Sequence, residues 1–389
     1  MRIALLSPLP PVQNGIADYA GHWRAALEAR GVEVLTPLAS ASVDAALAKF
    51  DWRKVDVVHA ELGGGRSREF LLLEALSKQQ PSLPLSATVH DPERLIWRAP
   101  QGLAWHRLPR PLPQVAALLG DHRTLARERA LAKALHTLVT LTDTGRTTLC
   151  ERMRLPPERV KVIPHGNASL DFVPPPAEGP LRLLYFGFLY PGKGIEDLLD
   201  GLSRCFATAP GLRDQLQLTL AGGSKPQLAF GGDRDYLAEL RSRVNRLGLH
   251  DAINWRLDLA SSDIPTLLQA HHALVLPYRD SRKLALLGRM RGTSGALSWA
   301  NACGRGALVS DARALAEEVA HGNGVTFPQG NVEALAARLI ELARDPQRCR
   351  QWAQSAARIG QARRWDAVAS QFQAHFESLC RGGMRHAYS

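Results

Sequence analysis

The sequence is poor in cysteine, and the few cysteines present exclude two common kinds of stabilised fold. Cys150, Cys205, Cys303, Cys349 and Cys380 are odd in number and widely spaced, and none belongs to a C-x-x-C pair. This arrangement argues against a disulfide framework and against a structural zinc site. It is typical of a protein in a reducing compartment, so we expect a cytoplasmic location.

Long apolar runs are absent as well. No stretch approaches the ~18 apolar residues that a membrane-spanning helix needs. The first apolar run carries a single basic residue and is broken at Pro8, which is too soon for a secretory signal. Any contact with the inner face of a membrane is therefore expected to be peripheral.

Recognisable catalytic and metal-binding patterns are missing too. The sequence shows no Ser/His/Asp triad and no Cys/His nucleophile. Its single D-x-D, Asp233-Arg234-Asp235, stands where a helix is expected to begin, a position that the helix dipole makes favourable for aspartate. His271 and His272 lack partner ligands at metal spacing and are expected to be structural. We therefore expect no metal and no cofactor.

The charge balance is the clearest compositional signal. Lys and Arg number 48 against 37 Asp and Glu, which gives a formal net charge of +11. Such a charge favours anionic partners such as nucleotides or acidic lipid surfaces. No nucleic-acid-binding module is recognisable, so we expect no nucleic-acid partner.

Short apolar runs alternate with helical or loop segments along the chain, which predicts parallel sheets covered by helices. In the first half, strands are expected at 2–9, 32–35, 55–59, 83–89, 138–141 and 160–163. In the second half, they are expected at 181–186, 216–220, 252–255, 273–276, 306–309 and 325–327. The chain from Val332 onward is expected to be helical.

The two halves open in the same way, with a strand, a glycine-bearing loop and a helix. Between them, residues 167–180 are rich in proline and suit a stiff connector. We expect an N-terminal Rossmann-like domain at 1–170, a second at 171–364 and a C-terminal helix at 365–389 that packs back on the first. Two doubly wound domains facing a central cleft would bind ligands at the carboxyl ends of their strands.

Two segments of the second half are candidates for phosphate binding. Lys193 lies between Gly192 and Gly194 just before a helix, where a flexible backbone and the positive helix end favour a phosphate. The alternative is a solvated loop lysine. Thr293-Ser294-Gly295 precedes another predicted helix, with Arg291 nearby, and would suit a diphosphate. The alternative there is a plain helix cap.

His90 and Asp91 end the predicted strand 83–89, at the edge where an α/β sheet presents functional groups. His90 could hydrogen-bond a sugar or position an acceptor, or it could be a structural histidine. The same alternatives hold for His59 with Glu61 and for His165.

Several segments together resemble glycosyltransferase family 4, and they follow one another in the order of that family along nearly the whole chain. In the first half these are residues 11–18 with Asn14-Gly15, Val89-His90-Asp91 and 162–166. In the second half they are 186–194, 220–223, 275–278 and 302–311. The resemblance implies a GT-B fold, a nucleotide-sugar donor on the C-terminal domain, and metal-independent transfer with retention of anomeric configuration.

The resemblance also implies roles for particular residues. His90 would contact the donor sugar and Lys193 would neutralise the leaving diphosphate, so both are the candidate catalytic residues. Donor-binding candidates are Asn14, Gly15, Gly187, Lys193, Arg291, Thr293, Ser294 and Gly295. Asp18 and Asp91 are expected on the acceptor side.

The sequence departs from the family pattern at several positions. Phe188 stands where a basic residue commonly follows the glycine of the second domain's first loop. The family's paired glutamates fall on Arg291 and Trp299, and tryptophan cannot accept hydrogen bonds from a ribose. Instead, residues 293–297 resemble a subgroup in which a Ser-Gly turn starts this helix.

The expected function is transfer of a hexosyl group, with mannosyl as one candidate, to a saccharide or glycolipid hydroxyl. Because the paired glutamates are missing, a non-catalytic GT-B scaffold or binding subunit is an alternative. Another GT-B nucleotide-sugar enzyme, such as a hydrolase or an epimerase, is a further one. The stretch from Arg94 to Lys133, which combines arginines with Trp97 and Trp105, could rest on an anionic membrane or be an ordinary surface.

Overall fold

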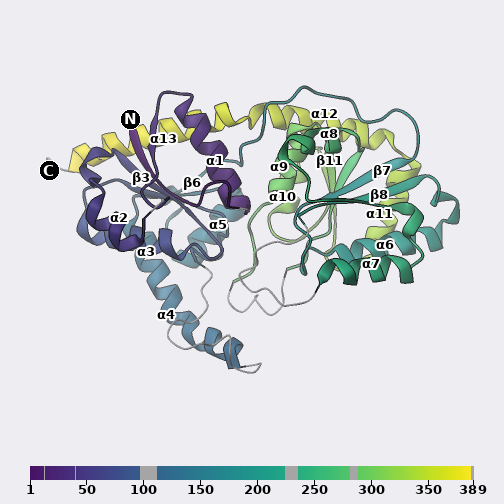
Figure 1. Ribbon diagram of the computed structural model, residues 1–389, viewed down its shortest axis with the longest axis horizontal. Coiled ribbons are helices and arrows are strands. Elements are labelled where there is room, and N and C mark those ends of the chain that lie inside the picture. Colours follow the sequence, from purple (N-terminus) through teal and green to yellow (C-terminus); the bar gives the residue numbers. More distant parts are fainter. Residues whose placement is uncertain (13, 40, 97–111, 224–234, 281–287, 387–389) are drawn as a thin grey trace. The chain divides into compact units, whose positions relative to one another are not determined.

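The computed structural model describes residues 1–12, 14–39, 41–96, 112–223, 235–280 and 288–386, without the side chains of 112–120 and 382–386. The chain divides into two compact units (Figure 1). Unit 1 comprises Met1–Gly166, Arg282–Gly292 and Trp365–Ser389, and unit 2 comprises Asn167–Ser281 and Thr293–Arg364. Residues 288–292, which the sequence placed in the second domain, thus group with unit 1.

Unit 1 is built on a six-stranded parallel sheet with the strand order β2-β1-β3-β4-β5-β6. Its strands are β1 (Arg2–Leu6), β2 (Glu33–Leu35), β3 (Val57–Leu62), β4 (Leu85–Val89), β5 (Thr137–Thr140) and β6 (Val160–Val162). The order of the strands reverses between β1 and β3, which pair in parallel. Ligands of such sheets bind outside the carboxyl ends of the strands at this reversal.

Unit 2 repeats the architecture with the order β12-β11-β10-β7-β8-β9, all parallel. Its strands are β7 (Leu181–Phe186), β8 (Leu216–Gly222), β9 (Ile253–Leu257), β10 (Ala273–Leu276), β11 (Gly306–Ser310) and β12 (Gly324–Phe327). Here the strand order reverses between β7 and β10. This is the Rossmann arrangement, in which a nucleotide lies at the reversal.

Helices cover the sheets within each unit. In unit 1 they are α1 (Gly15–Glu28), α2 (Val43–Lys49), α3 (Ser67–Gln79), α4 (Leu112–Ala134), α5 (Asp143–Met153) and α13 (Trp365–His386). In unit 2 they are α6 (Ile195–Thr208), α7 (Tyr236–Arg246), α8 (Ile264–Gln269), α9 (Gly295–Ala302), α10 (Leu315–Val319), α11 (Val332–Arg344) and α12 (Gln347–Ala362). The predicted α/β fold with two Rossmann-like sheets is confirmed.

Each strand expected from the sequence is present, because strands buried on both faces read as continuous apolar runs. The largest change is at β3, which extends to Leu62 and is buried throughout, His59 and Glu61 included. Because His59 and Glu61 interrupt the apolar run, the sequence pattern did not show that this strand continues to Leu62.

The C-terminal helix α13 packs against α1 in unit 1, where Figure 1 draws the two side by side. Val368, Phe372 and Phe376 of α13 join Tyr19 and Trp23 of α1 in one buried cluster. A last helix with an apolar face therefore covers the first sheet.

Unit 2 holds its connector through one buried arginine. Arg305 is fully buried, and its guanidinium donates hydrogen bonds to six main-chain carbonyl oxygens. Two of these acceptors, Val173 and Pro174, belong to the proline-rich connector. Hydrogen bonds from Arg305 to these two carbonyl oxygens thus attach the connector to unit 2.

Candidate functional site

The loops after β7 and β10 are fastened to each other where the strand order of the second sheet reverses. The backbone N–H of Arg279 donates to the carbonyl of Gly192. Gly194 has a φ of +69°, and a Cβ there would overlap the main-chain carbonyl of Pro277. Only glycine tolerates both the left-handed backbone and this close approach. Lys193 is therefore placed at the reversal by its two glycine neighbours.

Tyr278 connects three of the donor-binding residues predicted from the sequence. The ammonium group of Lys193 lies 3.8 Å from the centroid of its ring. Its hydroxyl hydrogen-bonds Ser294 Oγ at 3.0 Å, and a Cβ on Gly187 would lie 3.8 Å from the same hydroxyl. The ring is 1% exposed, and burial raises the pKa of Tyr278, so the phenol stays neutral. Residues from three separate loops thus meet at one side chain.

A second cation lies on the same ring. The guanidinium carbon of Arg313 is 5.0 Å from the Tyr278 centroid, and Arg313 has a φ of +57°. Lys193 is 9% exposed, so its charge is largely shielded from water. Lys193 and Arg313 thus bring two positive charges to one buried ring, a setting that favours an anion.

The start of α9 is not a plain side-chain cap. Ser294 occupies the N-cap position, but its side chain makes no capping hydrogen bond and pairs with Tyr278 instead. Thr293 Oγ1 is buried and makes no hydrogen bond within the described chain. Backbone N–H groups at a helix start form a ready site for an anion.

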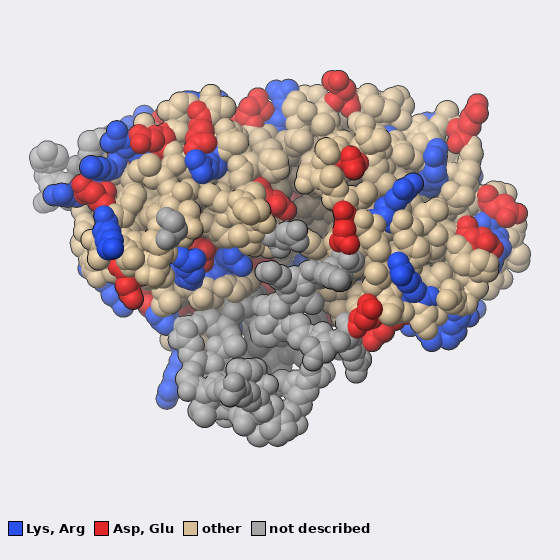
Figure 2. Space-filling model, viewed as in Figure 1, with Lys and Arg blue, Asp and Glu red and all other residues tan. Residues whose placement is uncertain are grey.

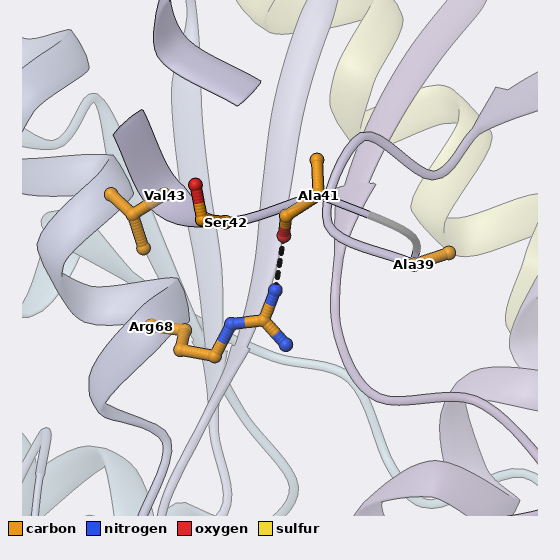
Figure 3. Close-up of a pocket in the computed structure, with 5 residues that line it drawn as sticks. All are labelled: Ala39, Ala41, Ser42, Val43 and Arg68. Carbon is orange, nitrogen blue, oxygen red and sulfur yellow. Dashed lines mark hydrogen bonds between the residues drawn. The ribbon is translucent and has the colours of Figure 1, made fainter. Parts of the chain in front are cut away.

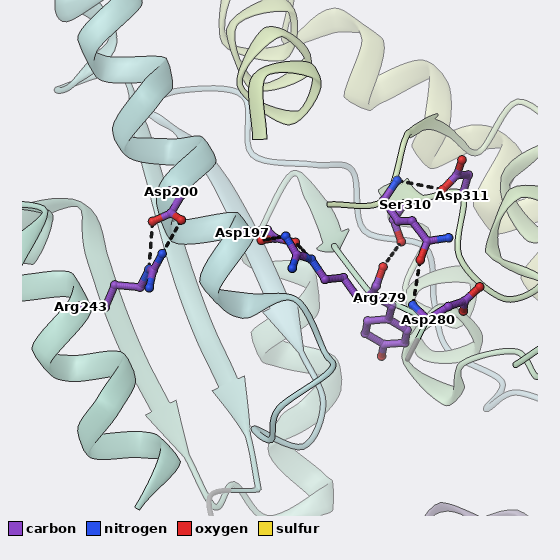
Figure 4. A network of polar contacts seen from close by, with 9 residues as sticks. Asp197, Asp200, Arg243, Arg279, Asp280, Ser310 and Asp311 are labelled. Carbon is purple, nitrogen blue, oxygen red and sulfur yellow. Dashed lines mark hydrogen bonds and ion pairs between the residues drawn. The ribbon is translucent and has the colours of Figure 1, made fainter. Parts of the chain in front are cut away.

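A polar network supports the loops around Tyr278 (Figure 4). Arg279 pairs with Asp197 through both carboxylate oxygens. Gln329 accepts a hydrogen bond from the Asp280 N–H and donates its own N–H to Asp311. Ser310 Oγ donates to the Tyr278 carbonyl at 2.6 Å. The ends of β10, β11 and β12 are thereby tied together.

In unit 1, His90 lies at the carboxyl end of β4 beside a buried carboxylate. Its Nε2 is 2.7 Å from Glu61 Oε2, and Tyr19 packs edge-on against the imidazole. Burial lowers the pKa of His90 to about 4, so the ring is neutral at pH 7. In the sequence, Glu61 attracted notice only as a neighbour of His59. The pattern that could have identified Glu61 as a candidate is a pair of polar residues, two positions apart, within an apolar strand.

The other N-terminal candidates have more local surroundings. Asn14 caps α1, because its Oδ1 accepts from the Ala17 N–H at 2.9 Å. Gly15 follows with open space where a Cβ would stand, so nothing in unit 1 itself requires glycine there. Asp18 is exposed on α1. Asp91 accepts a hydrogen bond from the N–H of Gly64 at 2.6 Å, which fixes the loop after β3.

Arg291 groups with unit 1, apart from Thr293, Ser294 and Gly295 of unit 2. Its backbone N–H donates to Glu93 Oε2 at 3.0 Å. A Cβ on Gly292 would lie 2.6 Å from the carbonyl oxygen of His90. The segment before α9 therefore runs against the end of β4, a long-range contact that sequence spacing did not indicate.

Residues 97–111 of the proposed membrane stretch, including Trp97, Trp105 and Arg107, lie outside the described residues. Its first residue is not at the surface: Arg94 is 3% exposed and pairs with Asp121 and Glu128. On the face shown in Figure 2, basic and acidic side chains are interspersed over the described parts. No helix among the described residues has the length and apolarity needed to span a membrane.

Asp235 caps α7, as expected for a helix start, while Asp233 and Arg234 lie outside the described residues. His271 Nδ1 donates to the Leu267 carbonyl, and its Nε2 lies 2.8 Å from Thr219 Oγ1. His272 Nδ1 accepts from the Arg182 N–H, so both histidines have structural partners. Within the described ranges no three His, Cys, Asp or Glu side chains form a metal-binding group.

A surface pocket of unit 1 is lined by none of the predicted site residues (Figure 3). It is lined by Ala39, Ala41, Ser42, Val43 and Arg68. The Arg68 guanidinium donates to the carbonyls of Leu38 and Ala41, and so holds the loop that leads to α2. The charged guanidinium of Arg68 therefore stabilises this loop.

The fold and the site define a class of protein. Two parallel six-stranded sheets, each doubly wound and covered by helices, constitute the predicted GT-B fold. Residues 168–359 match the family model of glycosyl transferases group 1. Unit 2, with Lys193, Tyr278, Ser294 and Arg313, is therefore a glycosyl transferases group 1 domain.

The chain is similar in sequence or in structure to several known proteins. A D-inositol 3-phosphate glycosyltransferase of Kineococcus radiotolerans is 25% identical over 254 residues, which are 62% of this chain and 57% of that relative. This chain therefore spans little more than half the length of that curated relative. Sucrose-phosphate synthase of Thermosynechococcus elongatus superposes with a TM-score of 0.71 at 18% identity, covering 98% of this chain and 100% of the other. HepE of Anabaena, solved with UDP, superposes with a TM-score of 0.67 at 19% identity, covering 97% and 100%.

Proposed function

We propose that the protein is a retaining, metal-independent glycosyltransferase that moves a hexosyl group from a nucleotide-diphosphate sugar to a saccharide or lipid-linked saccharide hydroxyl. One observation carries the proposal. Three donor-binding residues predicted from the sequence, Gly187, Lys193 and Ser294, meet at Tyr278 in the domain that matches the family. A nucleotide sugar is also the ligand of a structural relative, since HepE is solved with UDP-glucose.

The chemistry of this site suits a departing nucleoside diphosphate. As the glycosidic bond to the donor breaks, negative charge develops on the diphosphate. Lys193 and Arg313 would stabilise this charge as fixed cations, and the N–H groups at the start of α9 would add hydrogen bonds. Because Lys193 is buried, its charge acts with little screening. Together these groups would supply the stabilisation that a divalent metal provides in other transferases.

His90 is the residue that we propose to contact the donor sugar. Its imidazole is neutral at pH 7, and because Nε2 is engaged by Glu61, Nδ1 is the nitrogen left to hydrogen-bond a sugar hydroxyl. The open space beside Gly15 lets the backbone at the start of α1 come close to a ligand. The sugar is a hexose, with mannose as one candidate, and Asp18 and Asp91 are proposed to lie on the acceptor side.

The missing glutamates do not remove the phosphate-binding part of the site. Trp299, at one of those positions, packs against the core of unit 2 and offers no carboxylate to a ribose. The ribose contact must therefore come from another group. We place the protein in the cytoplasm as a divergent family 4 member, with its acceptor at the inner face of the membrane or in solution.

The test is binding followed by turnover. Nucleoside diphosphates and their hexose conjugates are titrated into the protein by calorimetry, and the best donor is incubated with saccharide and lipid-linked acceptors, with and without chelator. The proposal predicts one preferred nucleotide, release of its diphosphate, a product of unchanged anomeric configuration, and no effect of the chelator. Binding without turnover would identify a scaffold, and release without transfer a hydrolase. A strict requirement for added metal would overturn the metal-independent mechanism.

A further inference from the structure

Glu61 is a fully buried carboxylate at the end of a central strand of unit 1. Its ion-pair partners in the described structure are two histidines, with no lysine or arginine among them. Burying a carboxylate without a permanent cation costs several kcal/mol unless its hydrogen bonds are made. A side chain this costly at the ligand-binding edge of a sheet calls for a specific role.

A role in holding His59 does not explain why a carboxylate is buried at position 61. His59 Nδ1 bonds Ser86 Oγ at 3.1 Å and its Nε2 bonds Thr88 Oγ1 at 2.9 Å, so both ring nitrogens already have partners. Glu61 Oε1 lies 3.5 Å from His59 Nε2, beyond a good hydrogen bond. The short contact is the other one, from Glu61 Oε2 to His90 Nε2 at 2.7 Å.

The two nitrogens of His90 are in different surroundings. Nε2 is engaged by Glu61, whereas Nδ1 makes no hydrogen bond within the described chain, and the side chain is 13% exposed. A neutral imidazole carries one proton, so the partner at Nε2 decides what Nδ1 offers to a ligand. Burial raises the pKa of Glu61, and the contacts with His59 and Thr88 act in the opposite direction. In its ionised form, the Glu61 carboxylate at Nε2 holds the proton there and leaves Nδ1 as an acceptor.

We propose that Glu61 is a positioning residue that fixes His90 in the Nε2–H tautomer, so that Nδ1 accepts a hydrogen bond from a hydroxyl of the donor sugar. The second half of this statement rests on the proposed function, whereas the tautomer does not. Other ionisable groups that face His90 are Asp91, Arg66 and Tyr19. Asp91 would favour a charged ring, but burial outweighs it and holds the pKa of His90 near 4.

The tautomer can be read directly in the full-length protein by long-range ¹H–¹⁵N correlation with labelled histidine. The His90 signals are assigned by their loss in His90→Gln. We expect the Nε2–H pattern in the parent. Glu61→Leu removes the acceptor and should produce a mixture of tautomers, whereas Glu61→Gln keeps an acceptor oxygen and should retain the parent pattern. Ser86→Ala, which removes the partner of His59 Nδ1, should leave His90 unchanged.

The kinetic consequence follows the tautomer. Glu61→Leu should lower kcat by about 10- to 100-fold, the loss that removal of a supporting partner causes at metal-binding histidines. Nucleoside diphosphate affinity should remain near that of the parent, and Glu61→Gln should recover most of the activity. A purely structural role would lower stability without this split.

An Nδ1–H pattern in the parent would overturn the proposal, and so would an unchanged tautomer in folded Glu61→Leu. If Glu61→Leu does not fold, the parent spectrum and Glu61→Gln decide the matter. The expected tautomers in a protein that turns over no nucleotide sugar would uphold the positioning role and refute the proposed function.

Discussion

Replacing Lys193 with methionine should weaken nucleoside diphosphate binding and leave the fold intact. Methionine keeps the apolar stem and removes the ammonium group that lies 3.8 Å from the Tyr278 centroid. The residue is 9% exposed, so water screens its charge poorly. A hydrogen bond from such a cation to a phosphate contributes about 1.5–3 kcal/mol. Its loss corresponds to a rise in Kd of about 10- to 150-fold.

The free protein should change little in stability. Removal of the ammonium group forfeits a cation–π contact of about 1 kcal/mol but also relieves the desolvation of a nearly buried charge. Arg204→Met is the matched control, because it removes one positive charge from an exposed surface pair of the same unit. Exposed pairs contribute about 1 kcal/mol or less, so this control should bind nucleotide as the parent does.

Calorimetric titration of parent, Lys193→Met and Arg204→Met, with urea midpoints for each, gives the comparison. A folded Lys193→Met with the parent's Kd would refute the phosphate-binding role. An equal loss in Arg204→Met would show that net charge, and not the position of Lys193, governs binding.

Three further predictions concern the framework of the site. Arg305→Met leaves several buried carbonyls without donors and should lower the free energy of unfolding by about 3–5 kcal/mol in urea titrations; a loss near zero would contradict its structural role. Gly194→Ala should cost about 2 kcal/mol or more and weaken nucleotide binding, whereas Gly211→Ala, which has open space around it, should do neither. His272 has a folded pKa of about 4, below the ordinary 6.5, so its stabilisation is present above pH 6.5 and lost as the pH falls toward 4. The stability difference between the parent and His272→Gln should therefore shrink over this interval, and a constant difference would contradict the burial of a neutral ring.

The strands were predictable because fully buried parallel strands read as short apolar runs between helices. The turn at Lys193 was predictable for a local reason as well, since glycines on both sides of it mark a tight strand-to-helix turn. What the sequence could not give was the purpose of Gly194, which is the approach of a carbonyl from a loop more than eighty positions away.

Tyr278, Arg313 and Glu61 were not among the predicted site residues because their contacts are long-range. Tyr278 belonged to a recognised motif, but only the folded sheet shows that Lys193 and Ser294 meet there. Glu61 and His90 become neighbours because β3 and β4 pair in register, Leu62 opposite Val89. A sequence without the strand order cannot bring such side chains together.

The most direct test of the account is the location of a bound nucleotide by hydrogen–deuterium exchange. The protein is saturated with the nucleoside diphosphate that binds best, and amide exchange is compared with that of the free protein. The account predicts slower exchange at 187–194, 277–280 and 293–297, the loops that meet around Tyr278. Saturating nucleotide that leaves all three segments unprotected, or that protects only other parts of the chain, would contradict the assignment of the donor site.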